Sequence, residues 1–481
     1  IRNLGYKEIK KNITITGSTA IPNIYLEPDE ISLQDVVVTA RKSRPMTTSS
    51  NGKIHINVAQ SYLTDIGNAL EVLKHSPGVS VNNKGEISLA SLGGTAIYVN
   101  GRKVMLQGDE LSTYLRSMSS EKISQIEIAH NPNASFGSEG AGGIINIILK
   151  TSETSGFFVT TSHSVGYWEN LKQNSDFAIS YNTNKWQLGM NYNHSLGHHS
   201  MDYGYEKVQN GDKNISETTD TDKRNTYSAG IDFSWQPNQK NKLFINSTVN
   251  VLVGPGETET TTEIYQGTNL LDNILKARNN YIEQKNLQYS NNVNYQYRPS
   301  SKMQLSFSVD WTHFDGNARC EQPNEYFSAT NMPIRSDLFY SEPDKDIDIY
   351  ALLADYKYTP NAQNEILAGV KTTLINSNNT FLFKKNGAID TQRSNNFYYE
   401  EKNLEAYAQY THSWNKIELS AGLRMEYMHT YNRLKSQTNQ DSETNKQSHF
   451  RLFPNLSASY TINEKSKIAL AIQQKTGQTT L

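Results

Sequence analysis

From Gly156 onward, hydrophobic and polar residues alternate with a period of two in one segment after another. In one example, Leu305, Phe307, Val309 and Trp311 are separated by polar residues. Such alternation places the apolar side chains on one face of a β-strand and the polar ones on the other. The pattern predicts about 13 strands, each with an apolar face and a polar, repeatedly charged face. Further examples span residues 177–181, 188–192, 227–235, 366–370, 419–427, 456–462 and 468–472.

The connections between these strands alternate between short and long. A transmembrane barrel gives this pattern, with tight periplasmic turns and long external loops, whereas a soluble sandwich with Greek-key connections has no reason to. The first external link, residues 168–173, is short and departs from the pattern. Short turns are predicted at residues 182–184, 237–240, 299–301, 359–363, 414–415 and 463–465. Long polar loops are predicted at residues 197–224, 254–285, 315–344, 377–401 and 432–448.

Aromatic residues gather near the predicted strand ends. The aromatic girdles of a membrane barrel lie there, although ordinary strands are also rich in aromatic residues. The aromatic residues concerned are Tyr167, Trp168, Trp186, Trp235, Trp311, Phe314, Tyr356, Tyr358, Trp414 and Tyr427.

The first 152 residues have a different texture. Residues 1–34 show short alternating patterns that predict the last strands of a small β-domain. Residues 41–152 predict a compact α+β domain, with helices at 67–75 and 109–118 and a strand at 123–129. The dipeptide Asn100-Gly101 lies between two short apolar runs, which is the strongest short signal for a β-hairpin. A glycine-rich stretch near residue 140 leads into a further strand.

Composition narrows the class of protein. No stretch approaches the roughly 18 apolar residues that a membrane helix needs, so a helical membrane protein is excluded. The formal net charge is -2 and no domain is basic, which argues against nucleic acid as a partner. The single cysteine, Cys320, excludes an internal disulfide and a multi-cysteine metal site. The chain starts at Ile1 without a visible signal peptide, and we expect it to be a fragment.

Three stretches resemble the plug region of TonB-dependent outer-membrane receptors, most closely those of Bacteroidetes with a carboxypeptidase-regulatory-like domain in front. Residues 33–40, LQDVVVTA, resemble the TonB box that introduces the plug. Residues 97–104, IYVNGRKV, resemble the central hairpin of the plug. Residues 126–147 match the terminal plug pattern, in which an Asn-Pro and a glycine-rich turn precede the strand that leads into the barrel. Residues 450–472 resemble late barrel strands.

The resemblance implies a mainly β fold: an α+β plug domain followed by an antiparallel transmembrane β-barrel. Residues 1–34 would then end a regulatory-like β-sandwich, 35–40 would be the TonB-box-like segment, 41–152 the plug, and 153–481 the N-terminal part of the barrel. Such barrels have about 22 strands, so the 13 predicted here leave about nine unaccounted for. We therefore expect an incomplete barrel, because open sheet edges in lipid are costly.

The resemblance also implies residues with specific roles. The segment Asp35, Val36, Val37, Val38, Thr39 and Ala40 would contact the energy-transducing protein TonB, adding as a strand to its sheet. The alternative is that this segment only ends the first β-domain. The plug motif comprises Asn100, Gly101, Arg102, Asn131, Pro132, Gly137, Gly140, Gly142 and Gly143.

Two parts of the plug motif have alternative interpretations. The glycines lack the Lys-Ser/Thr of a phosphate-binding loop and precede a strand, so a tight turn is favoured. Arg102 is expected either to pair with a carboxylate of the barrel wall, such as Glu418 or Glu426, or to be solvated, and the sequence does not choose between the two.

No catalytic constellation, cofactor motif or convincing metal site is present in the sequence. His194, His198 and His199 have a spacing that could bind a transition metal, but histidines in an exposed polar loop usually do not. Asp220 with Asp222, or Asp344, Asp346 and Asp348, offer oxygen ligands for Ca²⁺ without the glycine and final glutamate of an EF-hand. We therefore expect neither an enzyme nor a cofactor.

Three functions compete. The first is TonB-dependent uptake of a solute of the siderophore, glycan, peptide or cobalamin class across the outer membrane of a Gram-negative bacterium. Its partners would be TonB, outer-membrane lipid and the imported solute, with a surface lipoprotein as an optional addition. The second is a non-transporting surface protein, such as an adhesin or assembly partner. The third, a soluble β-rich enzyme or carbohydrate-binding protein, is disfavoured by the loop alternation and the plug motifs.

Overall fold

A computed structural model of the chain describes most of its residues and divides it into two units, Ile1–Pro45 and Met46–Leu481. Described in the first unit are Lys10 and residues 24–25. Described in the second are residues 46–50, 53–82, 86–89, 95–104, 108–118, 120–129, 134, 136, 143–150, 155–168, 170–267, 269–436, 442–463 and 466–474. The predicted β-domain at residues 1–34 and the TonB-box-like segment 35–40 therefore lie outside the described residues, apart from Lys10 and residues 24–25.

The plug is a small α+β domain built on a six-stranded sheet with the order β1-β2-β7-β8-β5-β6. The pairing of β5 with β8 is parallel and the other pairings are antiparallel. The strands are β1 (Thr47–Ser50), β2 (Lys53–Asn57), β5 (Ala96–Val99), β6 (Arg102–Lys103), β7 (Ile123–Ala129) and β8 (Ile144–Leu149). The other elements are α1 (Ala69–Lys74), α2 (Gly108–Ser117), a hairpin of β3 (Val79–Val81) and β4 (Ile87–Leu89), and 3₁₀ turns at Tyr62–Asp65 and Ser120–Lys122.

The plug has a conventional hydrophobic core. Fifteen buried residues from the sheet and both helices form one cluster, in which Leu73, Leu115, Ile126 and Ile145 have no exposed surface. Helix α1 begins at its cap residue Asn68, whose side chain accepts a hydrogen bond from the backbone N–H of Glu71 at 3.0 Å. The helices, strand and hairpin expected in the plug are therefore all present.

The hairpin at Asn100-Gly101 has the backbone that its sequence predicts. Asn100 has φ 50° and Gly101 has φ 78°, the left-handed pair of a type I′ turn. The side chain of Asn100 accepts a hydrogen bond from the N–H of Leu149 at 3.0 Å. Buried Asn146 accepts one from the N–H of Gly101 at 2.8 Å. Hydrogen bonds at both turn residues thus hold the hairpin against β8.

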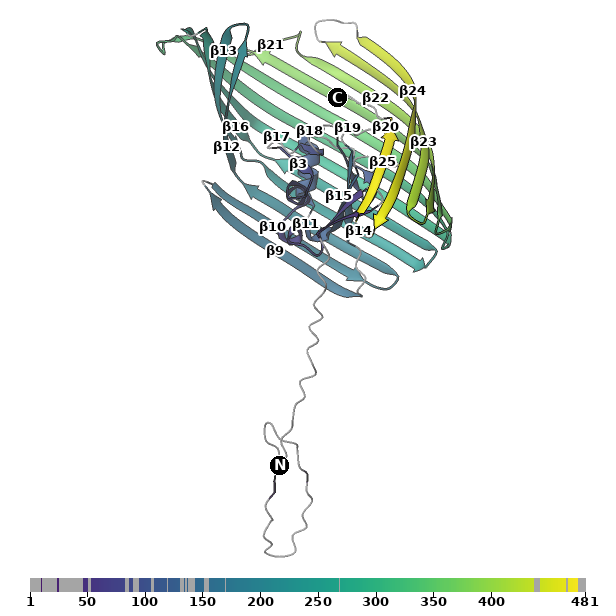
Figure 1. Ribbon diagram of the computed structural model, residues 1–481. Helices are drawn as coiled ribbons and strands as arrows, with labels where there is room; N and C mark the ends of the chain where they lie inside the picture. Colours follow the sequence, from purple (N-terminus) through teal and green to yellow (C-terminus); the bar gives the residue numbers. More distant parts are fainter. Residues whose placement is uncertain are drawn as a thin grey trace, which may run out of the picture. The chain divides into compact units, whose positions relative to one another are not determined.

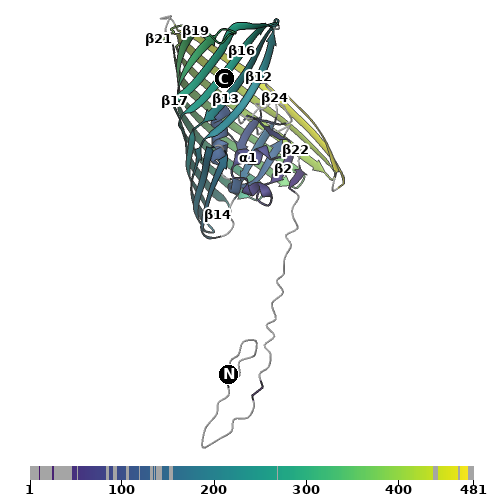
Figure 2. The ribbon, with the colours of Figure 1, turned by 90° about the vertical axis from the view of Figure 1, so that its left-hand side faces the viewer.

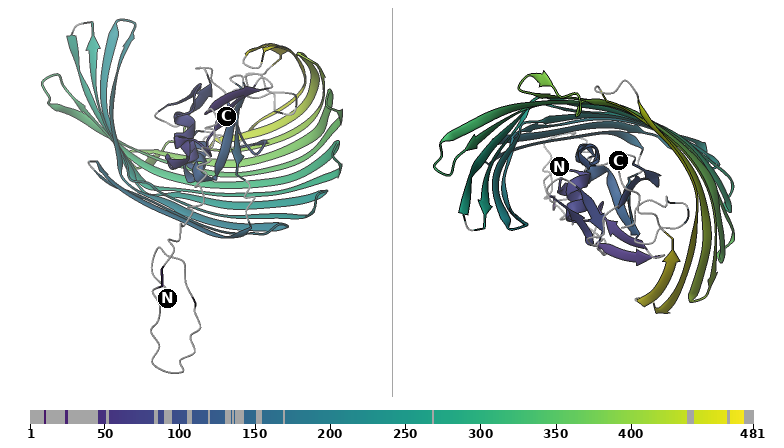
Figure 3. Two further views of the ribbon diagram at one scale, coloured as in Figure 1. Left: turned by 60° about the horizontal axis from the view of Figure 1, so that its bottom comes forward. Right: turned by 90° about the horizontal axis from the view of Figure 1, so that it is seen from above.

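The barrel wall is the antiparallel sheet that curves around the plug (Figures 1 and 3). Within the described residues, thirteen of its strands follow one another through the hydrogen-bonded pairings, in agreement with the predicted number. They are β9 (Gly156–Trp168), β10 (Asn170–Asn182), β11 (Trp186–Gly197), β14 (Asn225–Asn238), β15 (Asn241–Val253), β17 (Asn269–Ser300), β18 (Met303–Phe327), β19 (Pro333–Asn361), β20 (Asn364–Lys385), β22 (Asn395–Trp414), β23 (Ile417–Ser436), β24 (Glu443–Asn463) and β25 (Ser466–Gln473).

The short turns lie where they were predicted, but the prediction of long loops was wrong. The predicted loop 315–344 is mostly strand, because β18 and β19 continue to a short link between Phe327 and Pro333. Elsewhere the extensions include β12 (His199–Gln209), β13 (Asp212–Asp222), β16 (Gly256–Gln266) and β21 (Ala388–Ile389). Polar composition misled the prediction, because a strand outside the membrane can be solvated on both faces and still keep its backbone hydrogen bonds. Figure 2 shows these extensions reaching beyond the plug.

The two faces of the wall have opposite polarity, as the alternation predicts. On β23, Leu423 is 44% exposed and points away from the plug, while its neighbour Arg424 is 3% exposed. The outward apolar residues of β22 run from Leu404 to Trp414, and those of β23 from Ile417 to Tyr427. Ten residues at ~3.3 Å each, tilted by about 40°, give a band about 25 Å tall, the height expected of an outer-membrane barrel.

The aromatic residues near the strand ends divide between the two faces. Trp235, Trp311, Trp414 and Tyr427 are exposed on the outer face, where a girdle belongs. The prediction for Phe314 was wrong, because its side chain lies on the inner face and is 5% exposed.

In the described residues no helix is long and apolar enough to cross a membrane.

Candidate functional site: the interface between plug and barrel wall

A small set of polar residues holds the last loop of the plug to the wall. Arg424 of β23 donates hydrogen bonds from Nη1 to the carbonyl oxygens of Ala134 (3.1 Å) and Phe136 (2.9 Å). Gln409 of β22 accepts a hydrogen bond from the N–H of Ala134 at 2.9 Å. Arg424 also pairs with Glu405 of β22. We call Glu405, Gln409 and Arg424 the latch residues.

The latch residues are buried, so the charges of Glu405 and Arg424 must compensate one another. Glu405 and Arg424 have almost no exposed surface, and Lys371 of β20 lies 3.4 Å from Glu405. Removing one member of a buried ion pair typically costs several kcal/mol, because the other charge is left without compensation. The latch therefore favours one position of the plug loop over any other.

Gly422 of β23 lets the plug loop approach the wall closely. A Cβ atom at this position would lie 3.0 Å from the Cβ of Ala134 and 3.3 Å from the Oε1 of Gln409. A side chain at residue 422 would therefore require Ala134 or Gln409 to shift by a few tenths of an ångström. The glycine is thus required by close packing between the two parts, since its φ is not in the left-handed region.

A second contact lies on the opposite side of the plug. Lys122, the last residue of the 3₁₀ turn before β7, donates to the Oδ1 of Asn191 on β11 at 2.5 Å and lies 3.9 Å from Asp232 on β14. Burial lowers the pKa of Lys122, and the carboxylates of Asp232 and Asp176 act in the other direction. This contact holds the plug to the early strands, whereas the latch holds it to the late ones.

Lys103, at the end of the plug hairpin, faces the same charged inner wall as the latch. Burial lowers the pKa of its ammonium to about 7, with Lys371 acting in the same direction. The carboxylates of Glu401 and Glu426 oppose this shift. Lys103 is thus a plug group that changes its charge near neutral pH inside the interface.

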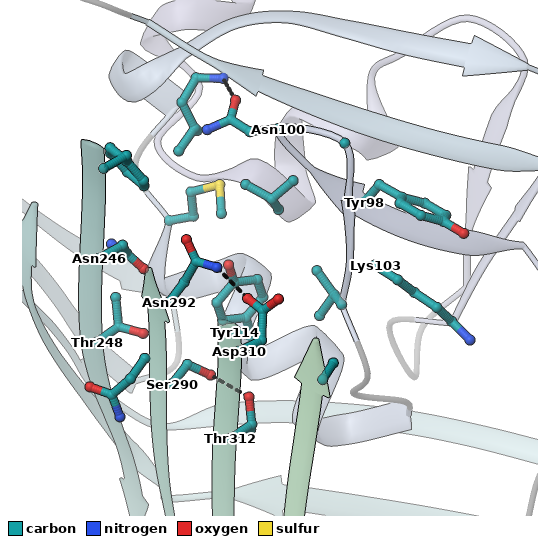
Figure 4. A pocket seen from close by; sticks show the side chains of 18 of the residues that line it. Tyr98, Asn100, Lys103, Tyr114, Asn246, Thr248, Ser290, Asn292, Asp310 and Thr312 are labelled. Carbon is teal, nitrogen blue, oxygen red and sulfur yellow. Dashed lines mark hydrogen bonds between the residues drawn. The ribbon is translucent and has the colours of Figure 1, made fainter. Parts of the chain in front are cut away.

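A cavity of about 200 Å³ lies between the plug hairpin, α2 and the wall (Figure 4). Tyr98, Asn100, Lys103 and Tyr114 line it from the plug. The wall contributes mostly amides and hydroxyls, including Asn246, Thr248, Asn250, Ser290, Asn292 and Thr312. Among the described residues, the buried Oδ1 and Nδ2 of Asn250 and the hydroxyl of Thr248 have no hydrogen-bond partner. Groups of this kind bind water or a polar solute.

The structure describes only part of the predicted plug motif. Asn131, Pro132, Gly137, Gly140 and Gly142 lie outside the described residues. Gly143 has φ 101°, a backbone conformation that favours glycine. Its carbonyl accepts a hydrogen bond from the N–H of Ala96 on β5 at 3.1 Å. The backbone of Arg102 forms β6 with Lys103, and its side chain is not among the described ones, so its pairing with Glu418 or Glu426 stays a prediction.

The predicted metal-ligand candidates lie on strands, except His198, which lies between β11 and β12. His194 is on β11, and its Nε2 lies 3.4 Å from the Nε2 of Gln173. Asp222 pairs with Arg224. The described part of the chain contains one group with ligand geometry, in which Asp346 and Asp348 lie close to His313. There Asp348 already accepts a hydrogen bond from the indole of Trp311 at 3.1 Å.

Sequence reasoning missed the latch residues and Lys103. Glu405, Gln409 and Arg424 belong to the polar face of predicted strands, where charged residues recur without a marker of which ones meet the plug. No signal in the sequence singles out Arg424, because the inward face of a barrel is polar and charged residues are common along it.

Comparisons with known proteins identify sequences and folds that are similar to this chain. The model of the outer membrane protein beta-barrel family matches residues 299–477. The vitamin B12 transporter BtuB of Vibrio vulnificus is 33% identical over 142 residues, which are 27% of this chain and 23% of that protein.

Two solved structures show the same fold. The ferric-catecholate import receptor Fiu of E. coli K12, in its closed form, superimposes with a TM-score of 0.61 and 12% identity, over 90% of this chain and 66% of that one. The ferric citrate transporter FecA, unliganded, gives a TM-score of 0.56 at 12% identity, over 86% of this chain and 61% of that one. The chain thus spans less than two thirds of each of these relatives.

A plug enclosed by a wall with an apolar outer band, the family match and the three plug-like stretches agree with one another. In these features the chain is similar to the TonB-dependent receptors of the Gram-negative outer membrane, and its residues 299–477 match the outer membrane protein beta-barrel family.

Proposed function

We propose that the protein takes up a solute across the outer membrane when TonB pulls on its plug. The observation that carries this proposal is the polar interface between plug and wall: the latch residues, Lys122 and the cavity beside the hairpin. The domain division at residues 34, 40 and 152 and the roles of the plug-motif residues belong to the same proposal.

A polar interface suits a part that must move. The apolar core of the plug is internal to it, so a shift of the whole plug exposes hydrogen-bonding groups that water can satisfy. The cavity beside Tyr114 and Asn250 already separates the plug from β15 and β17. A modest displacement there would widen a polar path through the barrel.

The pull would reach the plug through residues 35–40. An extended run of β-branched residues can add to the sheet of a partner by main-chain hydrogen bonds. TonB, the imported solute and a surface lipoprotein are the partners this mechanism would use.

A reversible cross-link tests whether the plug must leave the latch. In a Cys320→Ala background, Ala134→Cys and Gly422→Cys place two Cβ atoms about 3.0 Å apart, slightly closer than the usual ~3.5–4.5 Å of a disulfide. We expect the oxidised double variant to take up no solute and the reduced one to recover, while uptake by each single cysteine variant is the same under oxidising and reducing conditions. Full uptake by the oxidised protein would contradict the proposal.

The coupling segment is tested separately, in cells that express the full-length protein. Val37→Pro removes a backbone N–H that strand addition needs, whereas Val37→Thr keeps the backbone and the β-branched shape. We expect the first change to abolish growth on the transported solute and the second to preserve it. If deletion of residues 35–40 left uptake of every candidate siderophore, glycan, peptide and cobalamin unchanged, the alternative of a non-transporting surface protein would stand.

A further inference from the structure

The wall side of the cavity beside the plug hairpin carries a compact group of neutral polar side chains. Asn246, Thr248 and Asn250 of β15 are paired in register with Asn292, Ser290 and Gln288 of β17. All six line the cavity, and we call them the wall array. Figure 4 shows Asn246, Thr248 and Asn292 pointing from the wall toward the plug. The wall array therefore forms one hydrogen-bonding face of the cavity.

Part of the wall array has no partner within the protein. Hydrogen bonds satisfy Ser290, which pairs with Thr312 at 3.2 Å, and the amide nitrogen of Asn292. Among the described residues, both amide atoms of Asn250, the hydroxyl of Thr248 and the Oδ1 of Asn292 are buried without a hydrogen-bond partner. Asn250 is only 3% exposed. Unpaired buried groups destabilise a fold, so their presence in one cavity indicates that they serve a ligand.

The plug presents an apolar surface to the same cavity. Val99, Val104, Tyr114 and Met118 line it, and all four also pack against the hydrophobic core of the plug. Water molecules could bond to the wall array, but those in contact with the plug surface would lose hydrogen bonds. A ligand with one apolar face would displace these poorly held waters at a gain in affinity. The cavity therefore suits a molecule with an apolar face and a hydrogen-bonding edge.

The volume of the cavity limits this molecule to about one ring. The cavity measures about 200 Å³, and a protein cavity of roughly 150 Å³ accepts benzene. A six-membered ring with its substituents thus fits, whereas a metal chelate made of several rings does not. A hydroxyl group both donates and accepts a hydrogen bond, as the amide of Asn250 also does. A sugar ring has hydroxyls at its edge and C–H groups on its faces, so it matches both sides of the cavity.

The electrostatics of the cavity favour a neutral sugar. All the unpartnered atoms of the wall array are neutral. The charged groups nearby have partners of their own: Lys122 lies 3.9 Å from Asp232, and Lys371 lies 3.4 Å from Glu405. Figure 4 shows Lys103 pointing away from the wall array. An ionised ligand would therefore lose its hydration without gaining an opposite charge, which is unfavourable.

We propose that the cavity between plug and wall binds one neutral sugar ring, with hydroxyls on the wall array and a C–H face against Val104 and Tyr114. Asn250 determines specificity, because its amide offers a donor and an acceptor to neighbouring hydroxyls. The inference rests on the uptake proposed above and names its class of solute. A saccharide that passed the plug on the side of β15 and β17 would meet this site on its way.

The test measures sugar binding to the purified full-length protein in detergent by saturation-transfer NMR. The probes are the methyl glycosides of glucose, galactose, mannose and N-acetylglucosamine. Methyl glucuronide, which adds a carboxylate, and cyclohexanol, which keeps one hydroxyl, serve as contrasts. Thr248→Val/Asn250→Leu removes the unpartnered atoms of β15 with little change in volume. The matched control is Asn324→Leu, because Asn324 is also buried with an unpartnered Oδ1 but lies on β18 outside the cavity.

We expect at least one methyl glycoside to bind the parent, and to bind more tightly than methyl glucuronide and cyclohexanol. The cavity variant should bind it about tenfold or more weakly, the loss typical of a few hydrogen bonds, and Asn324→Leu should bind it like the parent. The cavity variant should also unfold at the same or a higher temperature than the parent, because it no longer buries unpaired polar groups. A purely structural role of Asn250 would instead lower that temperature.

Three results would overturn the sugar site: no methyl glycoside binds, the cavity variant binds like the parent, or both variants lose binding equally. Equal binding of methyl glucuronide or cyclohexanol would also overturn it, since the site would then select neither a neutral nor a polyhydroxylated ring.

Failure of the sugar site and failure of the proposed uptake are distinguishable. Binding in detergent requires neither TonB nor residues 35–40. A protein that binds a methyl glycoside but imports no solute in cells supports the sugar site and contradicts the uptake. Import of a siderophore or cobalamin by a protein that binds no methyl glycoside supports the uptake and contradicts the sugar site.

Discussion

The plug and the barrel wall use strands with similar alternation but bury opposite halves of them. In the plug, Ile126 and Ile128 of β7 are buried and the polar residues between them are more exposed. In the wall, Leu423 and Met425 of β23 are exposed, and the charged residues beside them are buried against the plug. The plug folds as a water-soluble domain does, whereas the wall has lipid outside and a polar interior.

This difference decides which interactions can be broken without unfolding either part. The plug core is apolar and continuous, so it behaves as one body. The interface is polar and is held by a few contacts, chiefly at Arg424 and Lys122. The boundary between plug and wall, which uptake would need to open, is therefore polar, whereas the core of the plug is apolar.

Arg424→Ala should have the largest effect on that boundary. It removes the donors to Ala134 and Phe136 and one cationic partner of Glu405, so we expect plug docking to weaken by ~3–5 kcal/mol. The urea concentration that displaces the plug, followed by labelling of a cysteine placed at residue 134 in a Cys320→Ser background, measures this. Arg278→Ala, at an exposed ion pair, should cost at most about 1 kcal/mol. Equal shifts for the two variants would mean that the latch does not hold the plug.

Ile126→Ala tests the plug as a soluble-type core. Its side chain has no exposed surface, and truncating a buried isoleucine typically costs ~2–5 kcal/mol. Urea unfolding followed by near-ultraviolet circular dichroism should show a destabilised plug, while the barrel keeps its resistance to detergent. Leu419→Ala, on the outer face of the wall, should leave the urea midpoint of plug unfolding unchanged. A lower midpoint for this variant would mean that the outer face of the wall also stabilises the plug.

Leu423→Arg tests the wall as a membrane surface. A charged residue near the middle of the apolar band costs ~2–4 kcal/mol, so we expect less folded barrel when the protein is refolded into lipid vesicles. The same substitution at Leu434, beyond the band on the same strand, should cost about 0–1 kcal/mol. If both variants folded equally well, the outward apolar band would not lie in lipid.

Lys103→Met tests the pH dependence of docking. Because the docked pKa of Lys103 is about 7 and its ordinary value is 10.5, the docked plug binds fewer protons than a released one between these values. Docking should therefore strengthen as pH rises from 7 toward 10, and lose this dependence below 7. Urea displacement at pH 7 and 9.5 measures the slope, which we expect to shrink in Lys103→Met. If the slope is unchanged in Lys103→Met, groups other than Lys103 cause the pH dependence of docking.

Local features of the fold were predictable because their causes are local. Asn100-Gly101 predicts a type I′ turn since both residues tolerate a positive φ. The short turns of the wall follow from strand alternation interrupted by turn residues. The long hairpins were predicted as loops, because side-chain polarity says little about whether a solvated backbone continues its pairing.

The candidate site was less predictable because its residues come from distant parts of the chain. Arg424 and Ala134 are 290 residues apart, and nothing near either residue identifies the other. The same holds for Lys103, whose pKa is lowered by burial and by two distant cations of the wall, Lys371 on β20 and Arg424 on β23.

The sequence by itself determined the alternating segments of the wall strands, their two faces and the resemblance to a receptor family, because alternation, turn residues and the plug motif are properties of short segments. Only the tertiary structure decided which inward charges meet the plug and which polar side chains of the wall face the cavity beside the plug hairpin. The physical reason is that register and curvature bring these groups together, and both depend on the pairing of all strands at once.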